Sequence, residues 1–161
     1  MIRFYDVDLA YINYLKQIDS KVPNISYNSN NKFVCGAVLE LNGIQYFAPI
    51  SHNSTLYRTS FGIYDSGQLI STVRFCFMFP TLQNVLSEKQ FSVIRTYDQN
   101  YANLLEKEWR YCVANEKDLR KKAESVYKMG CNCNHPMFKN CCDFKKLEAN
   151  YLNYLNNRTI N

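Results

Sequence analysis

The apolar positions near the N-terminus predict a strand followed by a helix. Residues 2–7 alternate briefly between apolar and polar side chains, as a short strand does. Asp8 can then cap a helix, because a side-chain oxygen at that position accepts a hydrogen bond from the first turn. The apolar residues at helical spacing are Tyr11, Tyr14, Leu15 and Ile18. The segment 21–24 ends the helix, and the polar residues up to 31 predict a loop.

The clearest local pattern predicts a β-hairpin over residues 32–50. Residues 32–41 are strand-like, Asn42-Gly43 is a preferred type I′ turn sequence, and residues 44–50 return as the second strand. Pro49 has no N–H to donate to a ladder, so we expect the second strand to end or bulge there. The chain then enters the polar segment 51–54.

The rest of the chain changes from strand to helix. Residues 60–65 and 68–79 flank a Ser66-Gly67 turn and predict a second hairpin, while residues 82–96 show no single period and leave room for one short strand. Helical spacing begins at Tyr97 and continues to Gly130, a natural C-terminal stop. The apolar residues of this stripe are Tyr101, Leu104, Leu105, Trp109, Cys112, Leu119, Ala123, Val126 and Tyr127.

The overall order of elements predicts the fold class. Asp143 can cap a last helix, and we find no repeat or linker, so residues 1–161 are expected to form one compact domain. Strands gather early in the chain and helices late. This order predicts an α+β fold with a mainly antiparallel sheet.

Composition narrows the class of protein. A hydrophobic content of 47% and a charged content of 20% exclude a disordered chain. No apolar run approaches the ~18 residues of a membrane span. The opening segment carries Asp6 and Asp8 where a signal peptide needs a basic region and then an apolar one. We therefore expect a cytoplasmic protein with no membrane partner.

The net charge of +5 is unevenly distributed. Residues 1–105 hold eight basic and seven acidic side chains, whereas residues 106–146 hold ten basic and six acidic ones. The later segment could form a face that attracts phosphates, or a solvated helical face. The 13 tyrosines would suit stacking on bases, although an AT-rich genome would also explain them.

The seven cysteines are odd in number and follow no export signal, so they are expected to be free thiols. Cys35, Cys76 and Cys112 lie within apolar patterns and predict small buried side chains. The segment 131–142 adds Cys131, Cys133, His135, Cys141 and Cys142, which could hold zinc. Its C-x-C and C-C spacings fit a zinc site poorly. A compact loop without metal or cofactor is the favoured interpretation.

Candidate chemistry gathers at the open end of the first predicted hairpin. Metal-independent RNA cleavage needs a base, a group that stabilises the phosphorane charge, and an acid. His52 could move a proton near pH 7, Lys32 could supply charge, and the hydroxyls of Ser51 and Tyr11 could orient phosphate oxygens. Because Lys32 begins one strand and Ser51-His52 ends the other, their backbones should lie within roughly 5–10 Å.

At these residues the chain resembles the ToxN/AbiQ family, the endoribonuclease toxins of type III toxin–antitoxin systems. Four segments carry the resemblance in order: Phe4-Tyr5 with the helix from Tyr11 to Lys16, then Asp19-Ser-Lys-Val-Pro-Asn24, then the hairpin Gly36–Ser51 with its Ala48-Pro49-Ile50-Ser51 corner, then Phe77-Met-Phe-Pro80. The match is closest over residues 1–80 and holds only in outline beyond them.

The resemblance implies a twisted antiparallel sheet of the MazF/Kid toxin type, surrounded by helices. It implies a metal-independent endoribonuclease that cleaves cellular or phage RNA, often in A-rich sequence, and leaves a 2′,3′-cyclic phosphate and a 5′-hydroxyl. It also implies inhibition by a repeat-derived, pseudoknotted antitoxin RNA that the toxin processes and binds in a closed assembly. The family's helix tyrosine, strand-initiating lysine and first corner hydroxyl fall on Tyr11, Lys32 and Ser51.

The residues expected to contact RNA extend around that cluster and along the basic later segment. They are Tyr14, Lys21, Asn53, Ser54, Arg110, Lys117, Arg120, Lys121 and Lys122. The chain also departs from the family pattern. His52 occupies the position of a second serine, no lysine follows it closely, and the 131–142 loop is unlike the family's. The roles are therefore expected to be redistributed, with His52 taking over proton transfer or charge stabilisation.

Two other functions fit the same residues. A non-catalytic RNA-binding module would use the basic segment and tyrosines, with Ser51 and His52 contacting phosphate only. A zinc-stabilised interaction domain would be built on the late cysteines. Cleavage of RNA in EDTA separates the enzyme from the module, and metal analysis tests the zinc domain.

Overall fold

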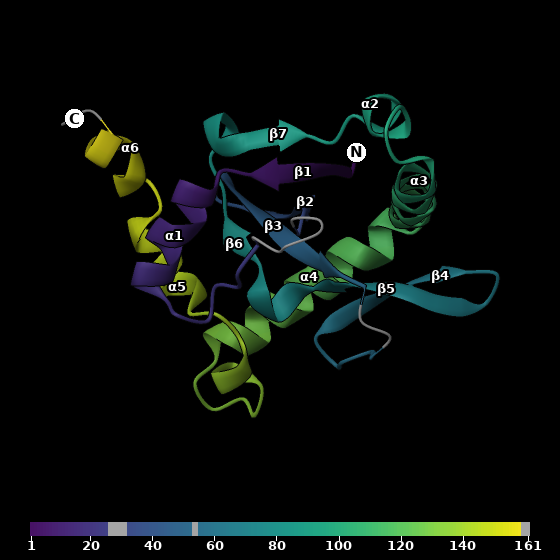
Figure 1. Cartoon of the computed structure of the whole chain (residues 1–161). Helices are drawn as coiled ribbons and strands as arrows, with labels where there is room; N and C mark the ends of the chain where they lie inside the picture. The colour runs from purple at the N-terminus through teal and green to yellow at the C-terminus, as the bar shows by residue number, and fades with distance from the viewer. Residues whose placement is uncertain (26–31, 53–54, 159–161) are drawn as a thin grey trace.

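The structure, a computed structural model, describes residues 1–25, 32–52 and 55–158. Residues 157 and 158 are described by their backbone alone. Its elements follow one another along the chain as Figure 1 shows. They are β1 (Arg3–Val7), α1 (Leu9–Ile18), β2 (Val34–Leu41), β3 (Ile44–Ser51), β4 (Ser60–Asp65), β5 (Gln68–Arg74), β6 (Phe79–Pro80), β7 (Leu86–Glu88), α2 (Phe91–Arg95), α3 (Gln99–Ala114), α4 (Glu116–Cys131), α5 (Phe144–Asn150) and α6 (Asn153–Arg158), with 3-10 turns η1 (Phe75–Phe77), η2 (Gln83–Val85) and η3 (Phe138–Asn140).

The described strands form one antiparallel sheet of seven strands. Six of them lie in the order β4-β5-β3-β2-β1-β7, and β6 pairs with β3 beside β5. The α+β class with a mainly antiparallel sheet is therefore confirmed. The path is open, because β4 and β7 are its edges and do not pair with each other. The sheet is therefore an open one.

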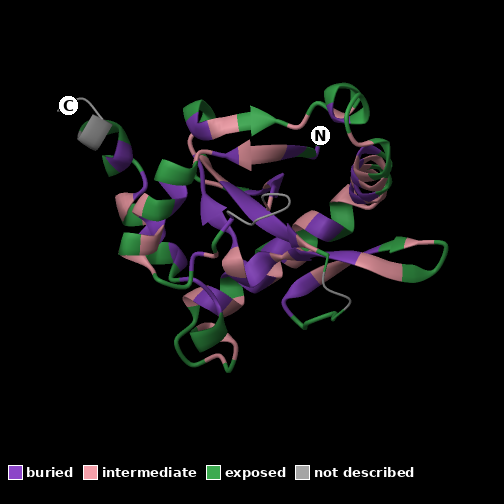
Figure 2. Ribbon diagram, in the orientation of Figure 1, coloured by how far each residue is buried: buried purple, intermediate pink, exposed green. Residues whose placement is uncertain are grey.

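Helices cover the sheet from several directions. The helices α1, α5 and α6 lie together beyond one end, α3 lies near the β4–β5 hairpin, and α4 runs across between them (Figure 1). The α4 helix packs on β2 through a buried stripe that includes Leu119, Ala123 and Val126. Figure 2 shows that β3 is largely buried, whereas the tip of the β4–β5 hairpin is exposed. The core therefore lies under the central strands.

Local sequence signals account for both hairpins and for the first helix. Asn42 and Gly43 have φ angles of 51° and 78°, as a type I′ turn requires, and Ser66 and Gly67 have φ angles of 50° and 80°. Asp8 accepts a hydrogen bond from the backbone N–H of Ala10 at 2.9 Å, which caps α1. The two predicted hairpins are confirmed.

The structure corrects several predicted boundaries. The strand β3 does not end or bulge at Pro49. Pro49 lies between the part of β3 that pairs with β6 and the part that pairs with β5. The missing N–H of Pro49 therefore costs no hydrogen bond of the ladder. The predicted strand 68–79 is interrupted by η1 and becomes β5 and β6. The helical segment from Tyr97 breaks at Asn115, and the last helix divides into α5 and α6. The unassigned segment 82–96 contains β7 and α2.

The late cysteine segment is a compact connection between α4 and α5. Cys141 and Cys142 are buried, and the backbone N–H of Cys142 donates to the carbonyl of Cys76 at 2.8 Å. Across residues 1–25, 32–52 and 55–158, no three His, Cys, Asp or Glu side chains are grouped to hold a metal ion. None of the described helices is both long and apolar enough to cross a membrane.

Candidate active site

The open end of the β2–β3 hairpin brings three of the predicted site residues together. Val34 pairs with Pro49, and the backbone N–H of Ile50 donates to the carbonyl of Phe33 at 3.2 Å. Continuing this register places Lys32 opposite Ser51, the last residue of β3. Cβ atoms at such facing positions lie about 4.5–5.5 Å apart. Lys32, Ser51 and the next residue, His52, therefore surround one strand end.

His52 leaves the end of β3 toward α3, where it meets a buried carboxylate. Its Nε2 lies 3.0 Å from Oε1 of Glu108, and the side chain of His52 is 44% exposed while that of Glu108 is 0% exposed. The His52 ring therefore has one edge in the protein and another in solvent. A histidine in this position can exchange protons with a bound substrate while the buried partner fixes its orientation.

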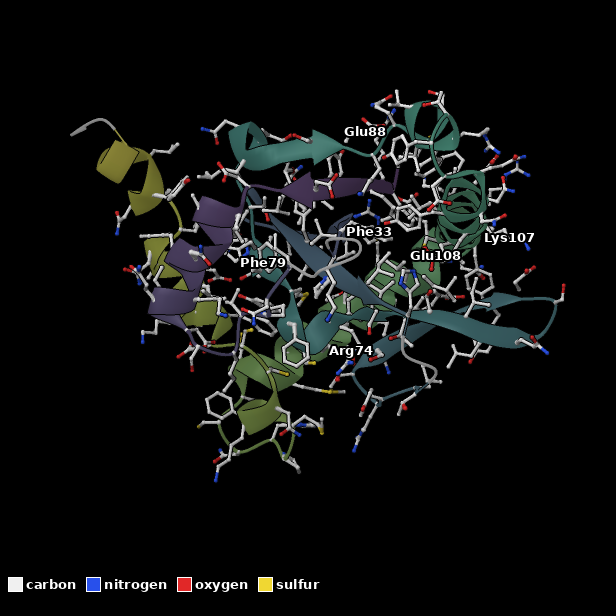
Figure 3. The ribbon with its side chains drawn as sticks, viewed as in Figure 1. Phe33, Arg74, Phe79, Glu88, Lys107 and Glu108 are labelled. Carbon is white, nitrogen blue, oxygen red and sulfur yellow. The ribbon has the colours of Figure 1, made fainter. Side chains whose placement is uncertain are left out.

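Glu108 belongs to the apolar face of α3 and is held by a second polar residue. The hydroxyl of Ser71, on β5, donates to the same Oε1 that faces His52. Its other oxygen, Oε2, is buried and has no hydrogen-bond partner within the described part of the chain. A buried carboxylate that is only half satisfied costs stability. Its retention is explained if its function is to hold His52. Figure 3 labels Glu108 beside the end of the central strands.

The hydrogen bond to Glu108 raises the pKa of His52 above its ordinary value. Burial of the ring opposes that increase, the negative charge of Glu108 adds to it, and the nearby positive charge of Lys32 lowers it. The increase is the net result.

This pKa shift predicts a pH-dependent contribution to stability. A raised folded-state pKa stabilises the fold fully below the unfolded pKa of about 6.5 and loses that effect as pH rises through the folded value. We expect His52→Gln to lower the melting temperature by about 2 °C more at pH 5.5 than at pH 9, a small difference because the ring is partly exposed. Thermal melts of both proteins at the two pH values measure it. An equal decrease at both would contradict the assignment.

An aromatic and cationic wall continues from the site toward β1. The Phe33 ring lies 6.3 Å from the His52 ring, and the Lys89 ammonium lies 5.7 Å from the Phe33 centroid. The Lys89 side chain is 11% exposed and forms a 2.8 Å ion pair with Asp6. Burial, followed by the negative charges of Asp6 and Glu108, raises the pKa of Tyr101 to about 12. Tyr101 therefore stays protonated at neutral pH.

The structure does not bring Tyr11 into this cluster. Its side chain is 0% exposed, and its hydroxyl donates to the backbone carbonyl of Pro80 at 2.7 Å. Pro80 pairs with Tyr46, five residues before Ser51, which is about 17 Å along β3. Burial also raises the pKa of Tyr11. The expected catalytic role is corrected here, because this hydroxyl is committed to the core.

The residues expected to contact RNA have diverse environments. The Tyr14 hydroxyl donates to the carbonyl of Asn150, and the Lys21 ammonium donates to that of Cys141, both at 2.8 Å. Arg110 and Arg120 form ion pairs with Glu106 and Glu116 on their own helices. Lys117 and Lys121 are exposed on α4, and Lys122 is half-buried. Asn53 and Ser54 lie outside the described residues.

The model of the toxin ToxN family, from type III toxin–antitoxin systems, matches residues 3–152. The chain belongs to the ToxN family. The endoribonuclease ToxN of Bacillus thuringiensis subsp. kurstaki is 28% identical over 94% of this chain and 84% of its own length. The endoribonuclease ToxN of Pectobacterium atrosepticum is 25% identical over 95% of this chain and 94% of its own.

Solved structures of the ToxN type share the fold. One, described for selective toxin inhibition by a non-coding RNA pseudoknot, is 26% identical, covers 95% of this chain and 97% of its own, and has a TM-score of 0.86. Another, from an antiviral system regulated by a processed non-coding RNA, is 25% identical over 94% and 98%, with a TM-score of 0.80. The lactococcal anti-phage endoribonuclease AbiQ is 24% identical, covers 97% and 99%, and has a TM-score of 0.82, which supports the fold.

Sequence reasoning missed Glu108, Ser71 and Lys89. Glu108 carried a usable signal, because it lies at helical spacing between Leu105 and Cys112 on the apolar stripe of α3. A charged residue on a core-facing stripe needs a buried partner. Ser71 and Lys89 had no such signal, since their contacts depend on how β5 and the segment after β7 pack in this ToxN fold.

Proposed function

We propose that this chain is the endoribonuclease toxin of a type III toxin–antitoxin system and acts in the cytoplasm. Family membership and the names of its relatives support the class of enzyme. By analogy with the pseudoknot-inhibited and RNA-regulated toxins, its partner is a repeat-derived, pseudoknotted RNA that it also processes and binds in a closed assembly. Kinship with MazF/Kid-type toxins remains a prediction.

The reaction that best fits the site is attack by a ribose 2′-OH on its own phosphate. The O2′–P bond forms, the P–O5′ bond breaks, the base accepts the proton of the 2′-OH, and the leaving 5′-oxygen takes up a proton. The products are a 2′,3′-cyclic phosphate and a 5′-hydroxyl. No metal ion is required by this proton balance.

The single observation that carries the proposal is the 3.0 Å contact between His52 Nε2 and the buried Glu108 carboxylate. Because Nε2–H donates to Glu108, the Nδ1 atom of His52 is left to give or take the substrate proton. Lys32 would neutralise charge on the phosphorane, and Ser51 would donate to a phosphate oxygen. Glu108 is assigned as a positioning residue, since it acts through His52 and is itself inaccessible.

The basic surface of α3 and α4 is the proposed path for the rest of the RNA. Lys117, Lys121 and Lys122 have no ion-pair partner among the described residues, whereas Arg110 and Arg120 are compensated by glutamates. The uncompensated lysines are therefore the stronger candidates for phosphate contacts. This surface would serve substrate and antitoxin alike.

A single-atom change in the RNA tests the proposed chemistry. Purified protein in EDTA should cleave an A-rich RNA and leave a 2′,3′-cyclic phosphate, identified by mass spectrometry. Replacing the nucleotide before the cleaved bond by its 2′-deoxy form should abolish cleavage there, because the attacking oxygen is gone. Cleavage that persists at the 2′-deoxy position would refute the mechanism. Binding without any cleavage would support the non-catalytic RNA-binding module instead.

A further inference from the structure

Arg74, at the end of β5, shares a sheet face with Ser51 of the candidate site. Ser51 pairs directly with Thr72, so these two side chains leave the sheet on the same face. Arg74 is two residues further along β5 and repeats that direction, about 7 Å away. Ser71 has the opposite direction and reaches Glu108. Continuing the register places Arg74 opposite Pro49, two residues before Ser51, on the face away from α3. Figure 3 shows its label and that of Glu108 on either side of these strands.

The guanidinium of Arg74 is held by aromatic rings and not by a carboxylate. Its Cζ lies 4.3 Å from the Tyr57 ring centroid and 5.2 Å from that of Phe77. Among residues 1–25, 32–52 and 55–156, no Asp or Glu forms an ion pair with Arg74. A half-buried cation without a counter-charge is costly. Stacking fixes the fork of the guanidinium while its charge remains available to an anion.

The surrounding polar atoms have unmet hydrogen-bonding capacity. Arg74 Nε is buried and has no partner in the described residues. Ser60 pairs directly with Arg74 across the β4–β5 ladder, and its hydroxyl is likewise buried without a partner, as is that of Thr72. Native proteins leave few such atoms, so their concentration on one face needs a cause. Arg74 itself is half-buried, so a ligand rich in acceptor oxygens can approach the outer part of its guanidinium.

Tyr57 adds a stacking surface to this cation. Its side chain is 44% exposed, although its ring already covers the Arg74 guanidinium. Exposed aromatic rings beside a basic group are the usual platform for unpaired bases, since every base has a face that stacks. The combination of an uncompensated arginine, an open tyrosine ring and a nearby scissile position fits single-stranded RNA better than a protein or a small anion.

We propose that Arg74 and Tyr57 form a subsite for the RNA nucleotide next to the cleaved bond. Arg74 takes the non-bridging oxygens of a phosphate one or two positions from the scissile one, and Tyr57 stacks on the adjoining base. The spacing is suitable, because Arg74 lies about 7 Å along the strand from the Ser51–Thr72 pair, a distance comparable with the separation of neighbouring phosphates in one RNA strand. This subsite rests on the proposed function only for its position relative to the scissile bond.

Binding to an uncleavable RNA tests the subsite without requiring catalysis. The probe is an A-rich 12-nucleotide RNA that is 2′-O-methylated throughout, titrated into purified protein at several salt concentrations. We expect Arg74→Gln to weaken binding about tenfold and to reduce the salt slope by about 1. Tyr57→Ala should weaken binding about tenfold with the slope unchanged, because it removes stacking and not charge. Arg58→Gln serves as the matched control, because it removes an equal charge from the exposed residue that follows Tyr57.

A second measurement assigns the phosphate. Each phosphate of the probe is replaced in turn by an uncharged methylphosphonate. Wild-type protein should lose affinity at each contacted phosphate, by about tenfold at the one that Arg74 holds, and Arg74→Gln should show no further loss at that position alone. Pairing the probe with its complement should remove the contribution of Tyr57. Equal effects of Arg58→Gln and Arg74→Gln, or a variant that responds to every methylphosphonate as wild type does, would overturn the proposal.

The two proposals fail separately. If the protein cleaves no RNA but the methylphosphonate pattern holds, the subsite stands and the enzymatic function does not. If cleavage occurs and the pattern is absent, the reverse is true. Repeating the titration with a pseudoknot-forming RNA distinguishes the sources of the phosphate. A loss confined to the linear probe assigns the subsite to substrate, and a loss with both RNAs assigns it to substrate and antitoxin.

Discussion

Replacing His52 with alanine is expected to lower the rate of RNA cleavage by about 10²–10⁴-fold, the usual effect of losing a general acid or base. The reason is local, because no other described imidazole lies at this strand end to replace it. Single-turnover cleavage of an A-rich RNA by purified protein measures the loss. In cells without the antitoxin, the same variant should no longer arrest growth.

The matched control is His135→Ala. His135 lies in the loop between α4 and α5, where its Nδ1 accepts a hydrogen bond from the backbone N–H of Met137 at 3.1 Å. Its replacement should leave the cleavage rate within about twofold, and both variants should melt cooperatively and bind the 2′-O-methyl RNA as wild type does. A fully active and folded His52→Ala protein would remove proton transfer from this residue.

Lys32 and Ser51 were accessible to sequence reasoning because a hairpin fixes its own register. The Asn42-Gly43 turn determines which residues face each other, and the pairing of Val34 with Pro49 extends to the strand end. Two positions 19 residues apart in the chain could therefore be placed side by side before any tertiary structure was known. The neighbourhood was predictable because its geometry is local.

The opposite side of the site was not predictable in the same way. Glu108 comes from a helix 56 residues after His52, and only its place on an apolar stripe indicated burial. The stripe cannot identify the partner, which depends on how α3 packs against the β4–β5 hairpin. The Tyr11 prediction failed for a related reason. Tyr11 lies on the buried face of α1, and its hydroxyl donates to the carbonyl of Pro80 inside the core. The helical spacing predicted the buried face, but it could not show whether the hydroxyl reaches solvent.

Glu108 shows how stability and function oppose each other in this fold. The core around it is apolar, and its Oε2 atom has no hydrogen-bond partner in the described residues. A neutral side chain of the same shape would remove the cost of burying this charge. The fold tolerates the carboxylate at a position where, among the residues that the structure describes, only His52 and Ser71 interact with its Oε1 atom. We therefore expect that removing the charge of Glu108 gives a variant with undiminished stability and a lower rate of RNA cleavage.

Glu108→Gln should lower the cleavage rate by about 10²-fold while the melting temperature stays equal or rises. The amide cannot provide the negative charge that stabilises protonated His52, so the pKa of His52 should fall, with burial and Lys32 both acting in that direction. The limb of the pH profile of kcat/KM that reports His52 should therefore move to lower pH. This holds whether His52 acts as the base, giving a rising limb, or as the acid, giving a falling one.

Glu106→Gln provides the comparison for that profile. Glu106 is on the same helix, but it faces solvent and forms ion pairs with Arg95 and Arg110. Its replacement removes the same charge from α3 without touching His52, so the rate and the limb should remain as in wild type. A structural role of Glu108 would lower the melting temperature and leave the limb in place. An acid shift of the limb in a stable Glu108→Gln protein occurs only if the carboxylate acts through His52, and an unshifted limb would remove Glu108 from the mechanism.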